Sequence, residues 1–305
     1  MSKNVIHIGA NKTGSTTLQR CLFSKSKDLV YIGEDGDDYA EHQDTILSLI
    51  SDDDIYFKAR EAEDLFKRKK ETAGDKTLLF SSEDIMTSHI PALCAKRLSG
   101  YLPDAEILLV VRNQLTAVPS MYANHGAYLR NVPRRYWKRF VSFDEWMDHS
   151  TNFIKYSLIG SYFYHRILCG FTQYFDRKKV KILFYEDFIS NPPGFIKDLC
   201  AILRIDADEA IGLVSSRRER TRNTMRQWQY HRFCDHFGGR DIIQYIPGAA
   251  LKDMARNYVQ SGPPAEGFMS DAWRKRVIEL YQEDNAKLMH EYGLDLKKYG
   301  YPLPG

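Results

Sequence analysis

Glycine, lysine and hydroxyl residues gather in one short segment near the N-terminus of the 305-residue chain. The segment follows an apolar run at residues 5–8 and precedes a helical pattern that begins near Ser15. Unpaired N–H groups and the dipole at a helix N-terminus favour an anion there. Gly9 and Gly14 have the glycine spacing of the nucleotide-binding loop G-x-x-x-x-G-K-[ST], but Ser15 stands where that motif has its lysine. The segment therefore predicts a phosphate-binding loop unlike that of an ordinary ATPase or GTPase, with Lys12 as its lysine.

Arg112 is a second candidate phosphate ligand, because it directly follows the apolar run at residues 107–111. Ser120 lies eight residues further on, within the next helical pattern. A guanidinium grips a phosphate through a fork of donors, and a serine hydroxyl adds another donor. Without further context a strand-end arginine is more often a surface ion-pair partner, so the hypothesis requires Arg112 to lie at the same edge as the loop around Lys12.

Glu83 is the candidate general base, and it follows the apolar run at residues 78–81. An acceptor hydroxyl is a poor nucleophile until a positioned group removes its proton. The neighbouring Asp84 is the rival for this role. The alternative without catalysis is that Glu83 stabilises the N-terminus of a helix through the helix dipole.

The elements that must position these residues are short apolar runs that alternate with helical patterns. The strand-like runs lie at residues 5–8, 78–81, 107–111 and 180–184, with a weaker one at 29–32, and helical patterns include residues 15–25, 54–70 and 90–102. Such alternation indicates a parallel sheet covered on both faces. We expect one α/β domain over residues 1–305, with three α/β/α layers and a mostly parallel sheet of about five strands, closed by a helix near 271–292. Ligands of such sheets bind beyond the carboxyl ends of the strands, where Lys12, Glu83 and Arg112 are expected to meet.

Composition limits the classes of function. Lys and Arg number 43 against 40 Asp and Glu, and the formal charge of +3 is too small to indicate nucleic-acid binding. Five scattered cysteines without a C-x-x-C pair favour a reducing compartment. No apolar run approaches the ~18 residues that span a bilayer, and the first strand-like run begins too close to Met1 to leave room for a signal peptide. We therefore expect a cytoplasmic protein without a membrane span.

The segment Lys-Thr-Gly-Ser-Thr-Thr at residues 12–17, directly after a strand, resembles the 5′-phosphosulfate-binding loop of the sulfotransferases. That family has a fold related to the P-loop kinases and NTPases. It moves a sulfuryl group from 3′-phosphoadenosine 5′-phosphosulfate (PAPS) to an acceptor, usually a hydroxyl or amine. The resemblance implies that Lys12 contacts the bridging oxygen of the leaving phosphate. The cofactor-binding residues that it implies in the loop are Lys12, Thr13, Gly14, Ser15, Thr16 and Thr17.

The resemblance continues beyond the loop. Arg112 and Ser120 match the family's 3′-phosphate element, and Ser-Ser-Glu at residues 81–83 matches carbohydrate-type and bacterial members that use a glutamate base. Tyr185 begins a Tyr-Glu-Asp whose tyrosine contacts the adenosine in the cytosolic members, while the two following carboxylates are expected to hold neighbouring loops.

An arginine-rich stretch at residues 217–223 sits where many members close a loop over the cofactor, which implies roles for Arg218 and Asn223. The stretch lacks the Arg-Lys-Gly signature of the cytosolic enzymes, and a solvated charge run is the alternative.

Together these features predict a PAPS-dependent sulfotransferase similar to the soluble bacterial type. Transfer is in line, without a required metal, and the product is 3′-phosphoadenosine 5′-phosphate (PAP). The expected acceptor is a carbohydrate hydroxyl, with a lipid or small-molecule alcohol next. A basic and aromatic stretch at residues 130–140 is the candidate lining of the acceptor site, within an insertion around residues 124–150.

Two other functions remain open from the sequence. A P-loop kinase for a small metabolite would need a lysine after Gly14 and a carboxylate for Mg²⁺. A protein that binds phosphoadenosine without catalysis would keep Arg112 and Ser120 but not need Lys12 or Glu83. A metal site at His231, Cys234 and His236 is disfavoured, because structural zinc usually needs four ligands at recognised spacings.

Overall fold

The computed structural model describes residues 3–125, 141–215, 223–238, 240–265 and 269–305. Its chain divides into two compact units. The first consists of Met1–Asn113, Ser161–Glu219 and Tyr281–Gly305, and the second of Gln114–Gly160 and Arg220–Leu280. Each unit is described by itself.

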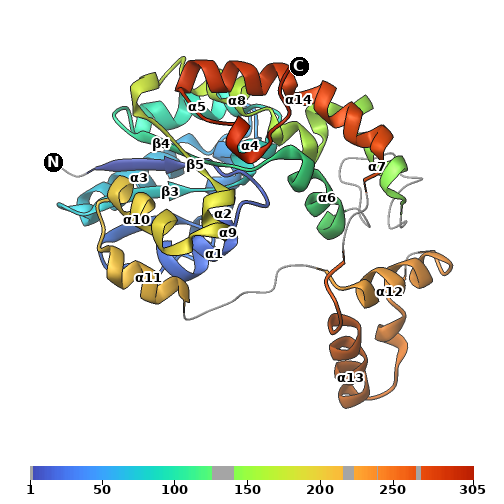
Figure 1. The fold of residues 1–305 in the computed structure, drawn as a ribbon. Helices are drawn as coiled ribbons and strands as arrows, with labels where there is room; N and C mark the ends of the chain where they lie inside the picture. The colour runs from blue at the N-terminus through green and yellow to red at the C-terminus, as the bar shows by residue number, and fades with distance from the viewer. Residues whose placement is uncertain (1–2, 126–140, 216–222, 239, 266–268) are drawn as a thin grey trace. The chain divides into compact units, whose positions relative to one another are not determined.

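The first unit is built on one parallel sheet of five strands, in the order β2-β3-β1-β4-β5 (Figure 1). The strands are β1 (Asn4–His7), β2 (Leu29–Gly33), β3 (Thr77–Ser81), β4 (Glu106–Val111) and β5 (Val180–Phe184). Every strand pairing is parallel, with Val5 opposite both Leu79 and Glu106. The predicted α/β fold and all five strand-like runs are confirmed.

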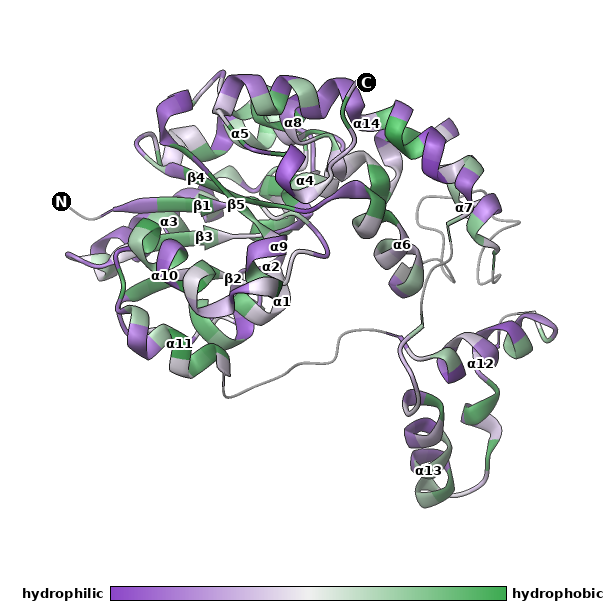
Figure 2. Cartoon of the chain, viewed as in Figure 1, coloured by the Kyte–Doolittle hydropathy of each residue, from purple (hydrophilic) through white to green (hydrophobic). Residues whose placement is uncertain are grey.

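Helices cover both faces of this sheet, which explains why its central strands are almost entirely apolar and buried. One layer contains α2 (Tyr39–Ser51), α3 (Ala59–Ala73), α5 (Pro91–Tyr101) and α8 (Tyr164–Phe171), and the other contains η1 (Leu18–Phe23), α10 (Pro192–Leu203) and α11 (Ala207–Ser215). The ribbons of these helices alternate between hydrophilic and hydrophobic residues, as expected for helices with one face on a sheet (Figure 2).

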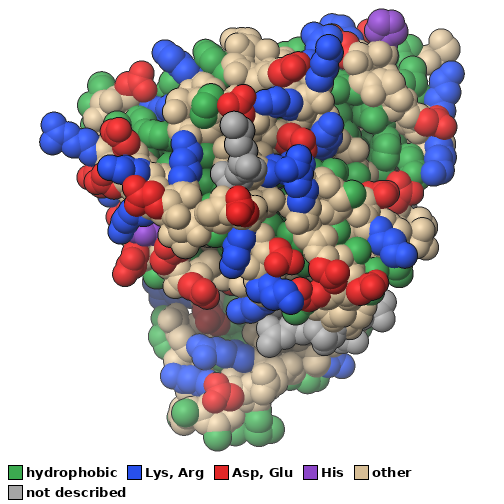
Figure 3. All heavy atoms as spheres, turned by 90° about the vertical axis from the view of Figure 1, so that its left-hand side faces the viewer, with side chains coloured by type: hydrophobic (Ala, Val, Ile, Leu, Met, Phe, Trp, Pro, Cys, Tyr) green, Lys and Arg blue, Asp and Glu red, His purple; other side chains and the backbone are tan. Residues whose placement is uncertain are grey.

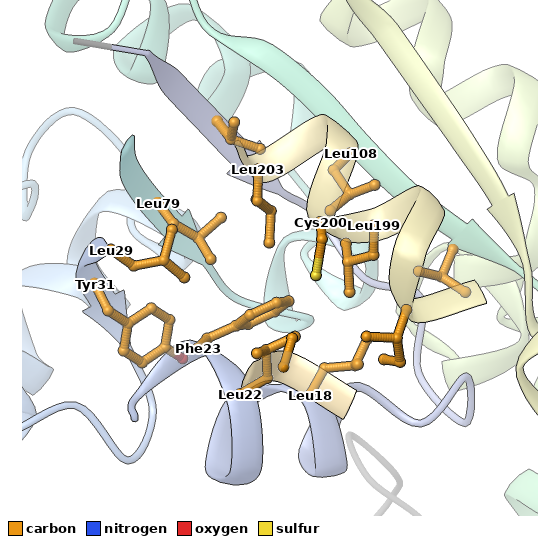
Figure 4. Close-up of a cluster of buried hydrophobic side chains, with 14 of the residues drawn as sticks. Leu18, Leu22, Phe23, Leu29, Tyr31, Leu79, Leu108, Leu199, Cys200 and Leu203 are labelled. Atoms are coloured by element: carbon orange, nitrogen blue, oxygen red, sulfur yellow. The ribbon is translucent and has the colours of Figure 1, made fainter. Parts of the chain in front are cut away.

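A hydrophobic core joins the second layer to the sheet (Figure 4). Leu18, Leu22 and Phe23 of η1 meet Leu79 of β3 and Leu108 of β4 in this core. Further contributions come from β2 and from α10, including Leu29, Tyr31, Leu199, Cys200 and Leu203. The core therefore anchors the segment that directly follows the predicted phosphate loop.

That segment differs from the predicted helix over residues 15–25. A short α-helix, α1 (Ser15–Thr17), passes directly into η1, which is a π-helix. π-Helical turns are rare and occur frequently at functional sites. The difference lies in the hydrogen bonding, since the backbone N–H of Ser24 donates to Gln19 O at 3.0 Å, five residues back, whereas an α-helix would use the carbonyl of Arg20, four residues back.

The second unit is helical in its described residues. It contains α6 (Gln114–His125), α7 (Phe143–Asn152), α12 (Met225–Asp235), α13 (Ala249–Gln260) and the first part of α14 (Asp271–Tyr292). α14 is the predicted closing helix: the Ser270 hydroxyl accepts from the N–H of Trp273 at its start, and Gly293 follows its end with a φ of 64°.

On the face drawn in Figure 3, basic and acidic side chains are intermixed, in line with the small formal charge of the chain. Within the residues that the structure describes, no helix combines the length and apolar character needed to cross a membrane.

Candidate active site

The loop after β1 is fixed at the carboxyl edge of the sheet by backbone pairing with β4. The N–H of Ala10 donates to Val110 O at 3.0 Å, and the N–H of Val110 donates to Gly9 O at 2.8 Å. The end of β3 is tied to β1 in the same way, because the N–H of Ser82 donates to His7 O at 3.1 Å. The three strand ends therefore present their following residues at one edge, as the sequence predicts.

The loop turns through left-handed backbone conformations at Lys12 and Gly14, whose φ angles are 67° and 81°. Thr13 lies between them without a positive φ, and its buried hydroxyl donates to Ala10 O at 2.6 Å. Turns that alternate in this way direct successive N–H groups into a concave anion site. Gly14 offers no side chain to cap the helix that follows, so the first N–H groups of that helix need another acceptor.

Two glycines allow other elements to approach the loop closely. A Cβ atom on Gly14 would lie 2.7 Å from Cε1 of Phe188, and its positive φ also favours glycine. A Cβ atom on Gly9, which has a φ of 115°, would lie 3.1 Å from Cγ of Met86 and 3.4 Å from Cα of Glu83. The second approach brings the residue after β3 against the loop.

Glu83 contacts the loop through its side chain. The Ser15 hydroxyl donates to Glu83 Oε2 at 2.5 Å, and the Glu83 carbonyl lies 3.5 Å from Asn11 Nδ2. Burial raises the pKa of Glu83 to about 7, while the Ser15 hydrogen bond and the Lys12 charge oppose this shift. A carboxyl group with a pKa near 7 suits a general base at neutral pH.

Asp84, the rival base, has a different place. It is the acidic residue in the first turn of α4 (Asp84–Thr87), where a carboxylate is favoured by the helix dipole. Glu83 precedes that helix without making a side-chain cap hydrogen bond to it.

Arg112 lies beside the loop and is only 7% exposed. Its Nη1 donates to Lys12 O at 2.7 Å, and its Cζ lies 4.5 Å from the centre of the Tyr185 ring. Its backbone is held by the Tyr164 hydroxyl, which accepts from Arg112 N and donates to Arg112 O. The structure thus brings together Lys12, Arg112 and Tyr185, which the sequence assigned to three parts of one cofactor.

The two carboxylates after Tyr185 hold neighbouring segments, as predicted. Glu186 accepts from the N–H of Asn113 at 2.9 Å and from the Tyr301 hydroxyl at 3.1 Å. Asp187 accepts from the Tyr299 hydroxyl at 2.6 Å. These bonds connect the ends of β4 and β5 to residues 299–301.

Two further predicted site residues belong to the second unit. Ser120 lies half-buried on α6 of the second unit. Asn223 also belongs to the second unit, where its side chain donates to Ala123 O and Asn124 O. Arg218 and the stretch at residues 130–140 lie outside the described residues.

His231 and Cys234 of the disfavoured metal site lie on α12, which ends just before His236, and Cys234 is buried. Among the described residues, no group of three or more His, Cys, Asp or Glu side chains is arranged to hold a metal ion.

Sequence reasoning missed two contributions to the site. The first is Tyr162, a buried residue whose hydroxyl lies 3.5 Å from Asn11 O and interacts electrostatically with Glu83. The second is the direct bond between Ser15 and Glu83, which are 68 residues apart. No periodicity or motif in the chain signals either contact.

Comparison with known proteins places these features in a family. Residues 2–233 match the sulfotransferase domain family. The fold is similar to a sulfotransferase from Alicyclobacillus acidocaldarius, with a TM-score of 0.58 and 17% identity over 98% of this chain and 99% of that chain.

Weaker similarities involve two further solved domains. The sulfotransferase domain of the Synechococcus PCC 7002 olefin synthase has a TM-score of 0.42 and 15% identity, over 97% of this chain and 96% of that chain. The sulfotransferase domain from the curacin biosynthetic pathway has a TM-score of 0.46 and 10% identity, over 100% of this chain and 99% of that chain. Among curated proteins, none matches. Because the family match covers well over half of the sequence, the chain belongs to the sulfotransferases.

Proposed function

We propose that this PAPS-dependent sulfotransferase sulfates an acceptor hydroxyl, with Glu83 as general base and Lys12 stabilising the leaving phosphate. The observation that carries the proposal is the position of Glu83. Its carboxyl group contacts the phosphate loop directly and has its pKa raised to about 7 by burial. A proton acceptor therefore lies next to the groups that would hold the reactive end of the donor.

The residues at the sheet edge fit a nucleotide with phosphates at both ends of its ribose. The left-handed turn at Lys12 and Gly14, together with the Ser15 hydroxyl, suits the 5′-phosphosulfate. The Arg112 guanidinium suits the 3′-phosphate, with Ser120 as a second donor, and the Tyr185 ring beside it suits the adenosine. Thr13, Thr16 and Thr17 complete the set that we assign to the cofactor in the loop, and Arg218 and Asn223 remain candidates for closing over it.

When bound, PAPS supplies an activated sulfuryl group. Glu83 accepts the proton of the acceptor hydroxyl as the new oxygen–sulfur bond forms. Lys12 and the N–H groups at the start of α1 stabilise the charge that develops on the leaving phosphate. Because the transferred group has one negative charge, where a phosphoryl group has two, this positive charge suffices without a metal in our proposal.

For the acceptor we favour a carbohydrate hydroxyl, with a lipid or small-molecule alcohol next. The support is the Ser-Ser-Glu context of Glu83, which resembles carbohydrate-type and bacterial sulfotransferases. The test is transfer from PAPS with labelled sulfur to panels of sugars, lipids and small alcohols, with E83Q as the matched inactive enzyme. Label on a sugar that depends on Glu83 supports the proposal, and label confined to amines contradicts it.

We also propose that the protein acts in the cytoplasm. All five cysteines are free, and four of them are buried: Cys21, Cys94, Cys200 and Cys234. Free thiols are the rule in reducing compartments. Fractionation of the native host should therefore recover the protein with the cytoplasmic fraction, and recovery from an oxidising compartment would contradict this.

A further inference from the structure

Ser15 belongs to the phosphate loop and also contacts the proposed base. Its hydroxyl donates to Glu83 Oε2, and its side chain is buried, with 2% of the residue exposed. A serine hydroxyl has one proton and can donate it to only one acceptor at a time. A phosphate seated in the loop would compete with the carboxylate for that proton.

Charged and titratable groups from four other elements face the Glu83 carboxyl. Lys12 of the loop favours its ionised form, whereas Glu34 after β2 and Asp84 of α4 disfavour that form. Tyr162 lies near enough to interact with it, and burial and the Glu83 charge both raise the pKa of its hydroxyl, which stays neutral. The Ser15 hydrogen bond is the larger of the two contributions that favour the carboxylate, ahead of Lys12.

We propose that Ser15 couples nucleotide binding to protonation of Glu83, by donating to the carboxylate in the free enzyme and to the 5′-phosphate in the complex. The inference rests on the proposed function, since it requires the nucleotide to occupy the loop. It assigns Ser15 a positioning role toward the base in addition to its role in binding.

The direction of the coupling follows from the contacts. Loss of the Ser15 hydrogen bond removes a stabilising contact of the carboxylate, and the anionic nucleotide adds repulsion, so the pKa of Glu83 rises on binding. The proton comes from solvent and is bound by a carboxyl oxygen of Glu83. Because the pKa of Glu83 in the free enzyme is about 7, part of the carboxyl groups are ionised at pH 7, so uptake by Glu83 is less than one proton per nucleotide.

The coupling has a consequence for catalysis. In the complex a neutral Glu83 carboxyl predominates near pH 7, and a neutral carboxyl group does not accept a proton from a hydroxyl or from water. Full proton-accepting capacity returns at a higher pH than in the free enzyme. The acid limb of kcat should therefore lie above that of kcat/KM for PAPS, since kcat reports on the complex and kcat/KM on the free enzyme.

The experiment is calorimetry of PAP binding at pH 7 in two buffers with small and large enthalpies of ionisation. The difference in observed enthalpy gives the number of protons taken up. E83Q cannot titrate at this position, so it measures the proton uptake of all other groups, the nucleotide phosphates included. We expect wild type to take up measurably more protons than E83Q, by less than one proton per nucleotide, because only the ionised fraction of the Glu83 carboxyl can take up a proton.

S15A tests the origin of the coupling, and S24A is its matched control. Ser24 lies nine residues further along the same segment, and its hydroxyl donates to Arg20 O at 3.1 Å. In S15A the pKa of Glu83 is already raised in the free enzyme, so uptake on binding should fall by half or more while binding weakens. S24A should match wild type in both measurements, and S15T, which keeps the hydroxyl, should restore most of the uptake.

The outcomes separate the coupling from the proposed function. Tight PAP binding with equal proton uptake in wild type and E83Q overturns the coupling and leaves the nucleotide site intact. Absence of PAP binding in a folded wild-type protein overturns both. Uptake in S15A equal to wild type also overturns the coupling, because the proton would then respond to the nucleotide charge without Ser15.

Discussion

Replacing Arg112 with alanine should separate the two ends of the nucleotide site. The proposed complex then loses the charge-assisted hydrogen bond between the guanidinium and the 3′-phosphate, which is worth about 1.5–3 kcal/mol. That energy corresponds to a loss of roughly ten- to a hundredfold in PAP affinity. The same guanidinium also holds Lys12 O at 2.7 Å, so the loop at the 5′ end loses a support in the same variant.

The loss of this support at Lys12 O lowers the affinity of every ligand that occupies the loop by the same factor. Lys12 is half-buried and water can replace the guanidinium at its carbonyl, so we expect about 1 kcal/mol, or less than tenfold. Adenosine 5′-phosphate, which lacks the 3′-phosphate, should show this common loss alone. The difference between the two ligands isolates the 3′ contact in a thermodynamic cycle.

Calorimetry with PAP and adenosine 5′-phosphate on wild type and R112A measures all four binding constants. R177A is the matched control, because Arg177 is an exposed partner of Glu291 away from the sheet edge and should leave both affinities unchanged. Equal losses for the two ligands in R112A would refute the assignment of Arg112 to the 3′-phosphate. Arg112 would then act on the 5′ end or on folding.

Four further predictions concern the loop and the base. Because Ser15 replaces the usual lysine of nucleotide loops, PAP should bind tightly without added metal and ATP only weakly, as calorimetry would show. E83Q should lower kcat by ~10²–10⁴-fold with little change in PAP affinity. D84N should change kcat only slightly and should move the acid limb of kcat/KM to lower pH, since Asp84 raises the pKa of Glu83. In wild type that limb should lie near pH 7, with activity present above it and lost as the pH falls and Glu83 takes up a proton. G14A should abolish PAP binding, because the new methyl group meets the Phe188 ring and the positive φ of this position disfavours alanine. The double variant G14A/F188A removes the contact with the ring but keeps the unfavourable φ, so it should recover stability more than PAP binding.

Each of these has a contrary outcome. Metal-dependent ATP binding tighter than PAP binding would favour kinase chemistry. An active E83Q together with an inactive D84N would show that Asp84 is the base. Activity in both variants would show that neither carboxylate at this strand end is the base. An acid limb well below pH 6 would show that burial does not control the Glu83 carboxyl. Unchanged PAP binding in G14A would place the nucleotide elsewhere.

The strands and the edge where their polar residues meet could be predicted because they depend on local patterns. Buried parallel strands read as continuous apolar runs, and parallel strands end on the same side. The closing helix could be predicted equally well, since Ser270 and Gly293 mark its ends. These signals suffice to bring Lys12, Glu83 and Arg112 together without a structure.

Other features depend on contacts that the local sequence does not encode. α2 (Tyr39–Ser51) has all its Ile and Leu residues in its second half, between positions 46 and 50, and it packs against α3 and α5. The helix predicted from residue 54 begins at Ala59, because the Asp53 side chain accepts from the N–H groups of Ile55 and Tyr56 and forms a turn there. The bond between Ser15 and Glu83 depends on how closely β1 and β3 approach beyond their ends, which the glycine at position 9 permits but no spacing reveals.

The bonds between residues 299–301 and the ends of β4 and β5 bear on the order in which the protein is made. Asn113 donates its side-chain N–H groups to Tyr299 O and Gly300 O, across 186 and 187 residues of sequence. Glu186 and Asp187 can accept hydrogen bonds from the Tyr301 and Tyr299 hydroxyls only after more than a hundred further residues have been translated. Until then, the neighbours of Arg112 and Tyr185 lack these partners on a chain that emerges from the ribosome N-terminus first. The loop around Lys12 therefore forms from early residues, whereas the supports of the opposite end of the proposed nucleotide site are set in place late in synthesis.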